Sequence, residues 1–392
     1  MARRSGGYPL LQFFTWATMG CFNPYVAIIL TDRGLDNTRI GLVLTLNAVV
    51  SILAQPAWGL VSDKIRSVRK VFIFCLAVAG LLILLLPWAR SLSQLVVLYP
   101  LILFFLSPLA PLLDVWTYQG VSNHPHSSYG QLRLFGSLGF AVFVIPLGRL
   151  VSMWGLNVTS YGFALLAVVS MVISLDLAPV RANEQTVMRP RLLPQLRLLL
   201  GQYRYVSFLV ILFLAFLAIQ PMFGFHARLM LSVGGTQEQF VWTMALAALS
   251  EIPVFLWSKK LLARFRPVRL LVFSLFVFIL RLTAYALVRE AWQVTAIGLT
   301  HGVSFALFLI ALVHYIDELA PEGLKSSALT IDSAGYVGLS GMAGNALAVC
   351  LMDRLEIQPV YGIGALVVLA ALALFLLSLL PGRQKKHRQA DP

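Results

Sequence analysis

The feature that most constrains this chain is a series of apolar segments, each about 20 residues long, that recurs along all 392 residues. A bilayer core about 30 Å thick needs roughly 20 apolar residues for each crossing helix. Only helices or closed barrels can cross it, because backbone groups find no water there. The segments are too long and too uniformly apolar for the alternating pattern of barrel strands. They therefore predict an all-α membrane protein.

We place about twelve transmembrane helices along the chain. The longest polar and basic stretch between them, 180–204, contains two prolines and five arginines, which is the composition of a linker. It predicts two six-helix halves at 1–179 and 205–380, followed by a basic tail at 381–392. The helices are expected near residues 8–31, 40–62, 71–89, 93–118, 130–154, 157–179, 205–231, 238–258, 268–288, 292–317, 325–350 and 358–380.

The charge distribution predicts the orientation. Charged residues make up only 12% of the chain, and its formal net charge is +14. With the N-terminus in the cytoplasm, the cytoplasmic loops and tails carry roughly 21 Lys and Arg and the other side roughly 7. Such a bias is typical of bacterial inner-membrane proteins, so we expect a multi-pass protein of that membrane with both termini in the cytoplasm.

Several function classes find no support in the sequence. The basic residues form no basic-aromatic patch of a nucleic-acid module. The sequence contains no P-loop, no H-E-x-x-H, no G-x-S-x-G and no CxxC, so neither an enzyme nor a bound cofactor or metal is expected. The three cysteines lack metal-ligand spacing. A lipid bilayer and a small solute are the partners that this composition favours.

One loop between predicted spans combines a glycine, an acid and basic residues. It follows the second span and contains Gly59, Asp63, Lys64 and Arg69. An acid at the end of one helix beside a basic turn can tether neighbouring helices and bias the molecule toward one conformation. We therefore predict a conformational loop at these residues. The alternative is an ordinary basic loop that reflects only its cytoplasmic side.

Ionisable residues inside predicted spans are the candidate site residues, because charges are costly at membrane depth. Asp114 and Arg133 are equidistant from the middle of the short loop 121–126, so antiparallel helices would hold them at similar depth. A carboxylate and a guanidinium so placed could pair. The pair is interpreted as part of a substrate or gating site. The alternative is a pair that only locks two helices together.

A second depth-matched set lies in the C-terminal half. Arg281 and His301 are equidistant from position 291, near the bilayer centre. A histidine beside a fixed positive charge suits a proton-linked site, although a buried histidine is often only a hydrogen-bonded core residue. Glu251 precedes a proline that loosens its helix and could open it to a cavity. His314 and Asp332 complete the intramembrane set.

Short motifs at these charged positions resemble a branch of the major facilitator superfamily. That branch includes lactose permease and the phenylpropionate and nucleoside proton symporters. The loop at Gly59 is similar to the G-x-x-x-D-[RK]-x-G-[RK]-[RK] loop of the superfamily, without its second glycine. The other matching stretches are Pro111-Leu-Leu-Asp114, Tyr129-Gly130-Gln-Leu-Arg133-Leu-Phe135-Gly136-Ser-Leu-Gly139, Ser250-Glu251, Arg281 and Thr300-His301-Gly302-Val-Ser304.

The resemblance implies the major facilitator fold and assigns roles to residues. Arg133, Glu251 and, approximately, Asp114 would bind the substrate. Arg281 and His301 would belong to the proton and gating machinery, to which Asp332 and His314 are added as further candidates. Lactose permease has a proton-carrying glutamate three residues after its histidine, where this chain has Ser304. Another acid must then carry the proton, or the coupling differs.

The function expected from these features is secondary active transport by alternating access. The leading hypothesis is a monomeric, proton-coupled importer of a small organic solute, such as an organic or aromatic acid, a sugar, a nucleoside or a siderophore-like compound. Proton-driven efflux of amphipathic compounds is the alternative within this class. A non-transporting membrane receptor and a membrane-embedded enzyme are the alternatives from other classes.

Overall fold

The computed structural model describes residues 7–35, 37–122, 128–177, 197, 199–321 and 324–379, and its regular elements over those ranges are helices. The helices of the N-terminal half are α1 (Gly7–Phe22), α2 (Val26–Asp32), α3 (Asn37–Ile65), α4 (Val68–Ile83), α5 (Leu92–Leu106), α6 (Leu109–Ser122), α7 (Tyr129–Trp154) and α8 (Asn157–Asp176). Those of the C-terminal half are α10 (Tyr203–Gly224), α11 (His226–Ser232), α12 (Gln237–Arg264), α13 (Pro267–Ala286), α14 (Ala291–Gly298), α15 (Leu307–Leu319), α16 (Lys325–Ser333), α17 (Ser340–Met352) and α18 (Ile357–Ser378).

Several crossings consist of two helices joined by a short break. A 3-10 turn at Asn23–Tyr25 joins α1 to α2, and π-helical turns at Gly302–Ala306 and Ala334–Leu339 lie before α15 and α17. Nine stretches of the described chain are long and apolar enough to span a membrane. The pair α1–α2 and the long helices α3 and α12 complete twelve crossings. The expected number of transmembrane helices is thereby confirmed.

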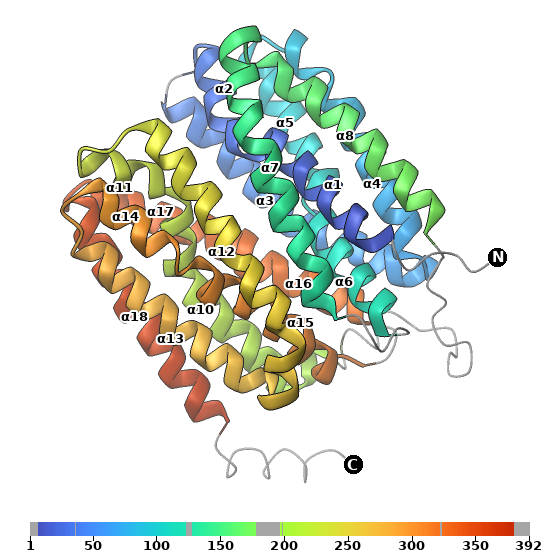
Figure 1. Ribbon diagram of the computed structural model, residues 1–392, viewed down its shortest axis with the longest axis vertical. Coiled ribbons are helices and arrows are strands. Elements are labelled where there is room, and N and C mark those ends of the chain that lie inside the picture. Colours follow the sequence, from blue (N-terminus) through green and yellow to red (C-terminus); the bar gives the residue numbers. More distant parts are fainter. Residues whose placement is uncertain are drawn as a thin grey trace.

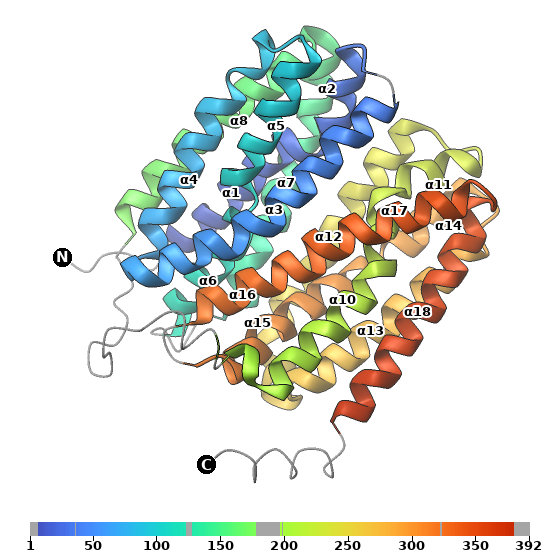
Figure 2. The same cartoon turned by 180° about the vertical axis from the view of Figure 1, so that it is seen from behind.

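The two halves form two bundles that lie side by side (Figures 1 and 2). Helices α1 to α8 make one bundle and α10 to α18 the other. We call the end at which α1 begins and α18 ends the terminal end, and the other the opposite end. Most of the predicted linker 180–204, up to residue 198, and the whole predicted tail 381–392 lie outside the described residues, save for Arg197.

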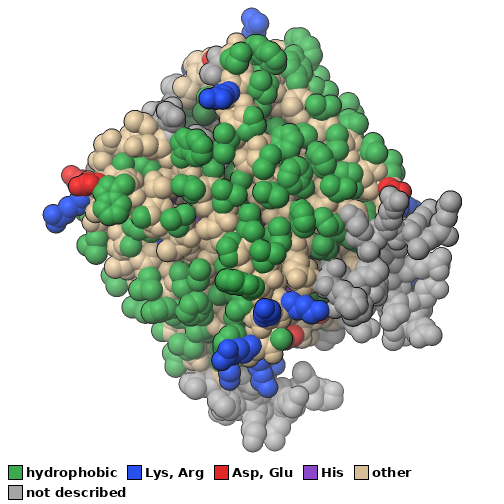
Figure 3. Space-filling view, in the orientation of Figure 1, with side chains coloured by type: hydrophobic (Ala, Val, Ile, Leu, Met, Phe, Trp, Pro, Cys, Tyr) green, Lys and Arg blue, Asp and Glu red, His purple; other side chains and the backbone are tan. Residues whose placement is uncertain are grey.

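The surface agrees with a membrane environment. Figure 3 shows hydrophobic side chains across the middle of the helices and basic side chains gathered near the terminal end. Leu81, Leu165 and Leu366 are each more than half exposed, as expected for side chains that contact lipid tails. The apolar exposed face and the buried polar residues between helices therefore have the distribution of a membrane protein.

Equivalent glycines allow close helix packing in both halves. A Cβ added at Gly139 of α7 would overlap the backbone oxygen of Phe13 in α1. A Cβ added at Gly344 of α17 would overlap the backbone oxygen of Leu217 in α10. Leu217 and Gly344 follow Phe13 and Gly139 by 204 and 205 residues, so the contact is repeated with nearly constant spacing. Such internal repetition is typical of transporters built from parallel repeats.

The end of α3 has a strained backbone at a position that usually favours glycine. Arg66 has φ of 52°, while the other two helix ends with this turn in the described part of the chain use Gly34 and Gly234. The backbone N–H of Arg66 donates to Asp63 (3.1 Å) and that of Ser67 donates to Ser62 (3.2 Å), which is the Schellman arrangement. Arg66 stands where the superfamily loop has its second glycine. The turn is therefore kept although the glycine is not, at a cost of about 1–2 kcal/mol.

Candidate functional site

A cavity of about 390 Å³ lies between the two bundles, in the size range of small-molecule sites. The N-terminal half contributes Trp16, Arg133, Ser137 and Phe140 to its wall. The remaining lining residues come from the C-terminal half, among them Phe240, which lies in the first turn of α12 at the opposite end. The cavity therefore extends from the middle of the molecule toward the opposite end.

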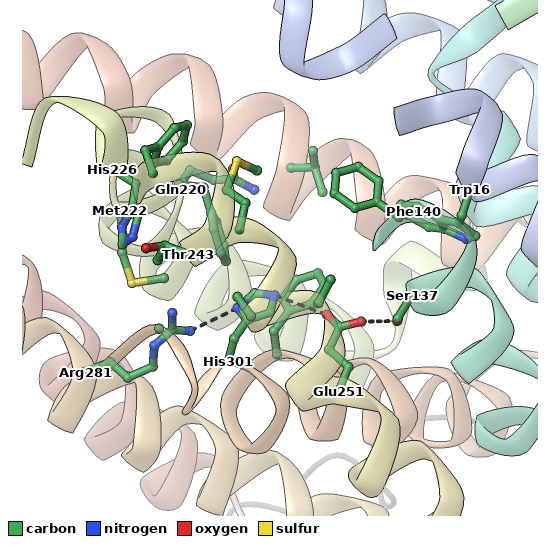
Figure 4. Close-up of a pocket in the computed structure, with 18 of the residues that line it drawn as sticks. Trp16, Ser137, Phe140, Gln220, Met222, His226, Thr243, Glu251, Arg281 and His301 are labelled. Atoms are coloured by element: carbon green, nitrogen blue, oxygen red, sulfur yellow. Dashed lines mark hydrogen bonds and ion pairs between the residues drawn. The ribbon is translucent and has the colours of Figure 1, made fainter. Parts of the chain in front are cut away.

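Four polar side chains form a continuous chain across this cavity (Figure 4). Arg281 Nη1 lies 3.2 Å from His301 Nδ1, and His301 Nε2 lies 3.1 Å from Glu251 Oε1. The other carboxylate oxygen of Glu251 accepts a hydrogen bond from the Ser137 hydroxyl. Because Ser137 is on α7 and Glu251 is on α12, this last bond joins the two halves.

The hydrogen bonds define the tautomer of His301. An arginine can only donate, so His301 Nδ1 must accept from Arg281. Nε2 then carries the hydrogen that is donated to Glu251. Arg281 also donates to Ser304 Oγ (2.7 Å) and to Tyr285 Oη (3.4 Å). His301 is thus uncharged here, and a proton on its Nδ1 would break its contact with Arg281.

The π-helical turn after His301 brings this histidine to Glu251. Gly302 opens the turn, and a Cβ there would overlap the backbone oxygen of Ser250. The backbone N–H of Gly302 donates to Ser250 Oγ (2.9 Å). Only a glycine lets this turn approach α12 so closely, so the local sequence determines where His301 lies.

Arg133 lies on the other side of the cavity, against an aromatic ring. Its guanidinium carbon lies 4.1 Å from the centre of the Trp16 ring, and its Nε lies 3.7 Å from Asp114 Oδ1. A Cβ at Gly136 would overlap both the Trp16 ring and the Arg133 guanidinium. Gly136 therefore makes room for a stacked cation and indole, an arrangement that is most favourable where water is excluded.

The remaining predicted site residues lie outside the cavity wall. Asp114 is 7% exposed and lies behind Arg133, so it reaches the cavity only through that arginine. Asp332 is fully buried within the described structure, and neither of its carboxyl oxygens has a hydrogen-bond partner there. His314 donates from Nδ1 to the Ile310 carbonyl (2.9 Å), and its ring contacts Tyr118 near the terminal end. Of the ionisable residues predicted inside the spans, Arg133, Glu251, Arg281 and His301 line the cavity, whereas Asp114, Asp332 and His314 do not.

The two halves are in contact at the terminal end. Asp63 Oδ2 accepts from the backbone N–H of Ser327 (2.8 Å) and from its hydroxyl (2.5 Å). Ser327 lies near the start of α16, so the carboxylate is at a helix N-terminus, where negative charge is favourable. Gly59, one turn earlier on α3, has no room for a Cβ because Thr330 packs against it. These contacts close the cavity toward the terminal end.

Further contacts support this closure. Tyr118 Oη donates to Asp317 Oδ2 (2.9 Å), and Asp317 also forms an ion pair with Lys325. The hydroxyls of Ser128 and Ser258 lie 3.0 Å apart across the halves. The terminal end is therefore held by hydrogen bonds from α3, α6 and the start of α7.

The residues of the predicted conformational loop contact different bundles. Gly59 and Asp63 contact the other half directly. Arg69 instead donates to the carbonyls of Leu175 (2.6 Å) and Leu177 (2.7 Å) at the end of α8, in its own half. Lys64 has an exposed side chain. Arg69 therefore joins two helices of its own bundle, while Asp63 contacts the partner bundle.

Sequence reasoning named only four of the 21 residues that line the cavity as candidate site residues, and it missed part of the closure. Trp16 and Ser137 line the cavity, and Ser327 holds Asp63. None of them is charged, so the search for charges at membrane depth passed over them. One signal was present, because Ser137 follows Gly136 in the motif around Arg133 and lies one helical turn from that arginine.

Comparisons with known proteins agree with this architecture. The maltose permease of Geobacillus stearothermophilus is 29% identical over 363 residues, which cover 92% of this chain and 91% of the permease. An uncharacterised transporter of Bacillus subtilis (strain 168), YwbF, is 22% identical over 97% of this chain and 94% of its own length. A crystal structure of a mutant of the nucleoside transporter NupG shares the fold, with a TM-score of 0.71, 16% identity, and coverage of 96% of this chain and 100% of that chain.

The family assignment rests on a match over nearly the whole chain. The model of the MFS_1 like family matches residues 8–363. This match includes every cavity residue described above and both bundles of the fold, apart from Gly7 at the start of α1 and the part of α18 after residue 363. The chain belongs to the MFS_1 like family and is a membrane transporter of the major facilitator type, not an enzyme.

Proposed function

We propose that the protein is a proton-coupled importer of a neutral sugar. It would work as a monomer by alternating access in a bacterial inner membrane, with the terminal end in the cytoplasm. The observation that carries this proposal is the chain from Arg281 through His301 and Glu251 to Ser137, because it places one titratable carboxylate between the two halves.

The charges around the cavity support a neutral solute. Two arginines, Arg133 and Arg281, are balanced by two carboxylates, Asp114 and Glu251. Asp114 pairs with Arg133 from behind, and the uncharged His301 links Arg281 to Glu251, so these four charges offset one another. The likeness to a maltose permease over most of the chain supports the sugar class within the neutral solutes.

Glu251 is the acid that we assign to the proton. It accepts one hydrogen bond from each half, from Ser137 and from His301. Hydrogen bonds to a carboxylate are roughly twice as strong as neutral ones. A proton on Glu251 would therefore weaken the bond to Ser137 and favour separation of the halves at this depth. Ser304, at the position where lactose permease has its proton-carrying glutamate, instead accepts from Arg281.

The closed end supports import as the direction of transport. The excess of Lys and Arg in the loops at the terminal end supports a cytoplasmic location for it. The cavity would then extend toward the outside, ready to receive a solute. An inward proton gradient would then favour the change of the loaded transporter to the conformation that is open to the cytoplasm.

The test begins with binding and continues with uptake. Thermal stabilisation of the purified protein is measured with sugars, nucleosides and aromatic acids at two pH values, and the best solute is then used in proteoliposomes. We expect stabilisation by a sugar and faster accumulation with an imposed inward proton gradient. Stabilisation only by an anionic acid, or uptake that ignores the gradient, would overturn the proposal.

Glu251→Gln tests the assigned proton carrier. Loss of the titratable group should abolish gradient-driven accumulation, while exchange of solute across the membrane without a gradient persists. Asp353→Asn, at an exposed acid outside the cavity, is the matched control. If Asp332→Asn removes the response to the gradient and Glu251→Gln does not, the assignment to Glu251 is wrong.

A further inference from the structure

The turn that joins α12 to α13 at the terminal end is strongly basic. Between positions 252 and 289 the sequence contains no Asp or Glu. Five cations with exposed side chains lie close together in this stretch, and we call them the basic corner: Lys259, Lys260, Arg264, Arg266 and Arg269. The corner therefore has a formal charge of +5 that no acid nearby in the sequence offsets.

Two arginines of the basic corner differ from their counterpart in the other half. At the start of α4, Arg69 donates to the carbonyls of Leu175 and Leu177. Arg266 and Arg269 lie at the start of α13, and within the described part of the chain no hydrogen bond or ion pair to their guanidinium groups is found. Their donors are therefore available to a group from outside the protein.

The face of α13 that carries Arg269 continues toward the middle of the molecule as an exposed apolar face. Phe273, Phe276 and Leu280 are each about half exposed. They follow Arg269 by 4, 7 and 11 residues, which is the spacing of one helix face. This helix is long and apolar enough to span a membrane. Its exposed face therefore contacts lipid tails, and Arg269 lies at the level of the head groups.

Helix α12 repeats this arrangement with the chain running in the other direction. Leu249, Pro253 and Leu256 are exposed and precede Lys260 by 11, 7 and 4 residues. Trp257 lies just before Lys260 and is 60% exposed. An exposed tryptophan at this level is typical of the boundary between lipid tails and water. Both helices therefore combine a face for acyl chains with cations at its terminal end.

We infer that the basic corner binds the phosphate head groups of anionic phospholipids in the leaflet at the terminal end. Figure 3 shows basic side chains gathered at this end next to exposed hydrophobic ones. Free phosphate would use the cations alone, whereas a phospholipid uses the cations and the apolar faces together. Basic residues next to a membrane span attract anionic lipids in this way. The inference is independent of the solute that the protein carries.

The experiment measures which lipid the full-length purified protein retains. Phosphatidylglycerol and phosphatidylcholine with identical acyl chains are added in competition, and bound lipid is counted by native mass spectrometry. The wild type should retain phosphatidylglycerol in preference. Arg266→Gln combined with Arg269→Gln should weaken its binding by about thirtyfold, which is about 2 kcal/mol. Equal retention of the two lipids by the wild type would overturn the inference.

The matched control removes the same charge from the other half. Lys64→Gln combined with Lys70→Gln changes two exposed residues at the terminal end, and should weaken phosphatidylglycerol binding by less than about threefold. Equal losses in the two double variants would mean a general attraction to a basic surface, and would overturn the corner as a site.

Two further measurements complete the test. If the arginine variant is unstable in detergent, Lys260→Gln combined with Arg264→Gln replaces it, with the same expected loss. Glycerol phosphate, a soluble head group without tails, should not displace phosphatidylglycerol at equal concentration. Displacement would show a site for free phosphate and overturn the lipid assignment. Solute binding by the wild type is measured separately, so failure of the lipid site would leave the proposed transport untouched.

Discussion

Arg133 has a role that depends on the shape of its side chain as much as on its charge. The guanidinium stacks on Trp16 at 4.1 Å and at the same time approaches Asp114 at 3.7 Å. A planar, delocalised cation can do both, because one face meets the indole while its edge meets the carboxylate. The position of Trp16 at the cavity wall therefore depends on this arginine.

Replacing Arg133 by lysine tests this dependence. Arg133→Lys keeps the charge but loses the plane, so solute affinity should fall by about tenfold or more. Titration of the stabilising solute into both proteins measures the change. Arg149→Lys, at an exposed position on the same helix, should bind as the wild type does. If the affinity of Arg133→Lys for the solute were unchanged, the stacking of Arg133 on Trp16 would not be required for binding.

At the scale of elements, the glycine contacts explain how broken and bent helices still pack tightly. Gly139 and Gly344 bring α7 onto α1 and α17 onto α10 at equivalent places. The π-helical turns before α15 and α17 lie in the half that supplies most of the cavity wall. Such turns are frequent at functional sites, because they redirect side chains without ending the helix.

Gly139→Ala is expected to be strongly destabilising. Its Cβ would overlap backbone atoms of Phe13, which cannot turn away as a side chain can. Overpacking of this kind costs about 1–3 kcal/mol, and should lower the thermal unfolding midpoint in detergent. Gly148→Ala on the same helix meets only the Tyr25 hydroxyl at 3.8 Å, and should be neutral or stabilising. Similar midpoints for the two variants would contradict the close contact.

The sequence predicted what depends on local geometry. Arg281 and His301 were matched in depth because their helices are antiparallel about one turn, and the structure places their nitrogens 3.2 Å apart. Depth does not determine which face of a helix a residue occupies, so it could not show that Arg133 lines the cavity while its partner Asp114 lies behind it. The bond between Ser137 and Glu251 depends on how two separate bundles dock. The spacing of residues along the sequence of one bundle cannot predict how the two bundles dock.

At the scale of the whole molecule, the contacts at the terminal end oppose the opening of the cavity there. Asp63 is held by two hydrogen bonds from the start of α16, and Gly59 allows α3 to approach Thr330. These bonds are made between the halves, so they must break when the bundles separate at that end. Their loss changes the balance of two conformations rather than the stability of either bundle.

Asp63→Asn should shift that balance toward an open terminal end. The amide keeps the size of the side chain but loses the charge that favours the helix N-terminus, an effect of about 0.3–2 kcal/mol. Distances between spin labels on the two halves at the terminal end would report a larger open population. Lys64→Gln, at the exposed neighbour, should leave the distances unchanged. An unaltered distribution in Asp63→Asn would show that the other contacts suffice for closure.

The balance of two arginines against two carboxylates around the cavity, which supports a neutral solute, also bears on how the membrane potential can drive transport. A neutral sugar that crosses with one proton moves one net charge, so each cycle is electrogenic. The membrane potential then adds about 2.3 kcal/mol per 100 mV to whatever the pH difference provides. At about 1.4 kcal/mol for each factor of ten, that alone would sustain a sugar concentration ratio of roughly 40 to 50. Accumulation would therefore continue in a cell whose interior and surroundings have the same pH.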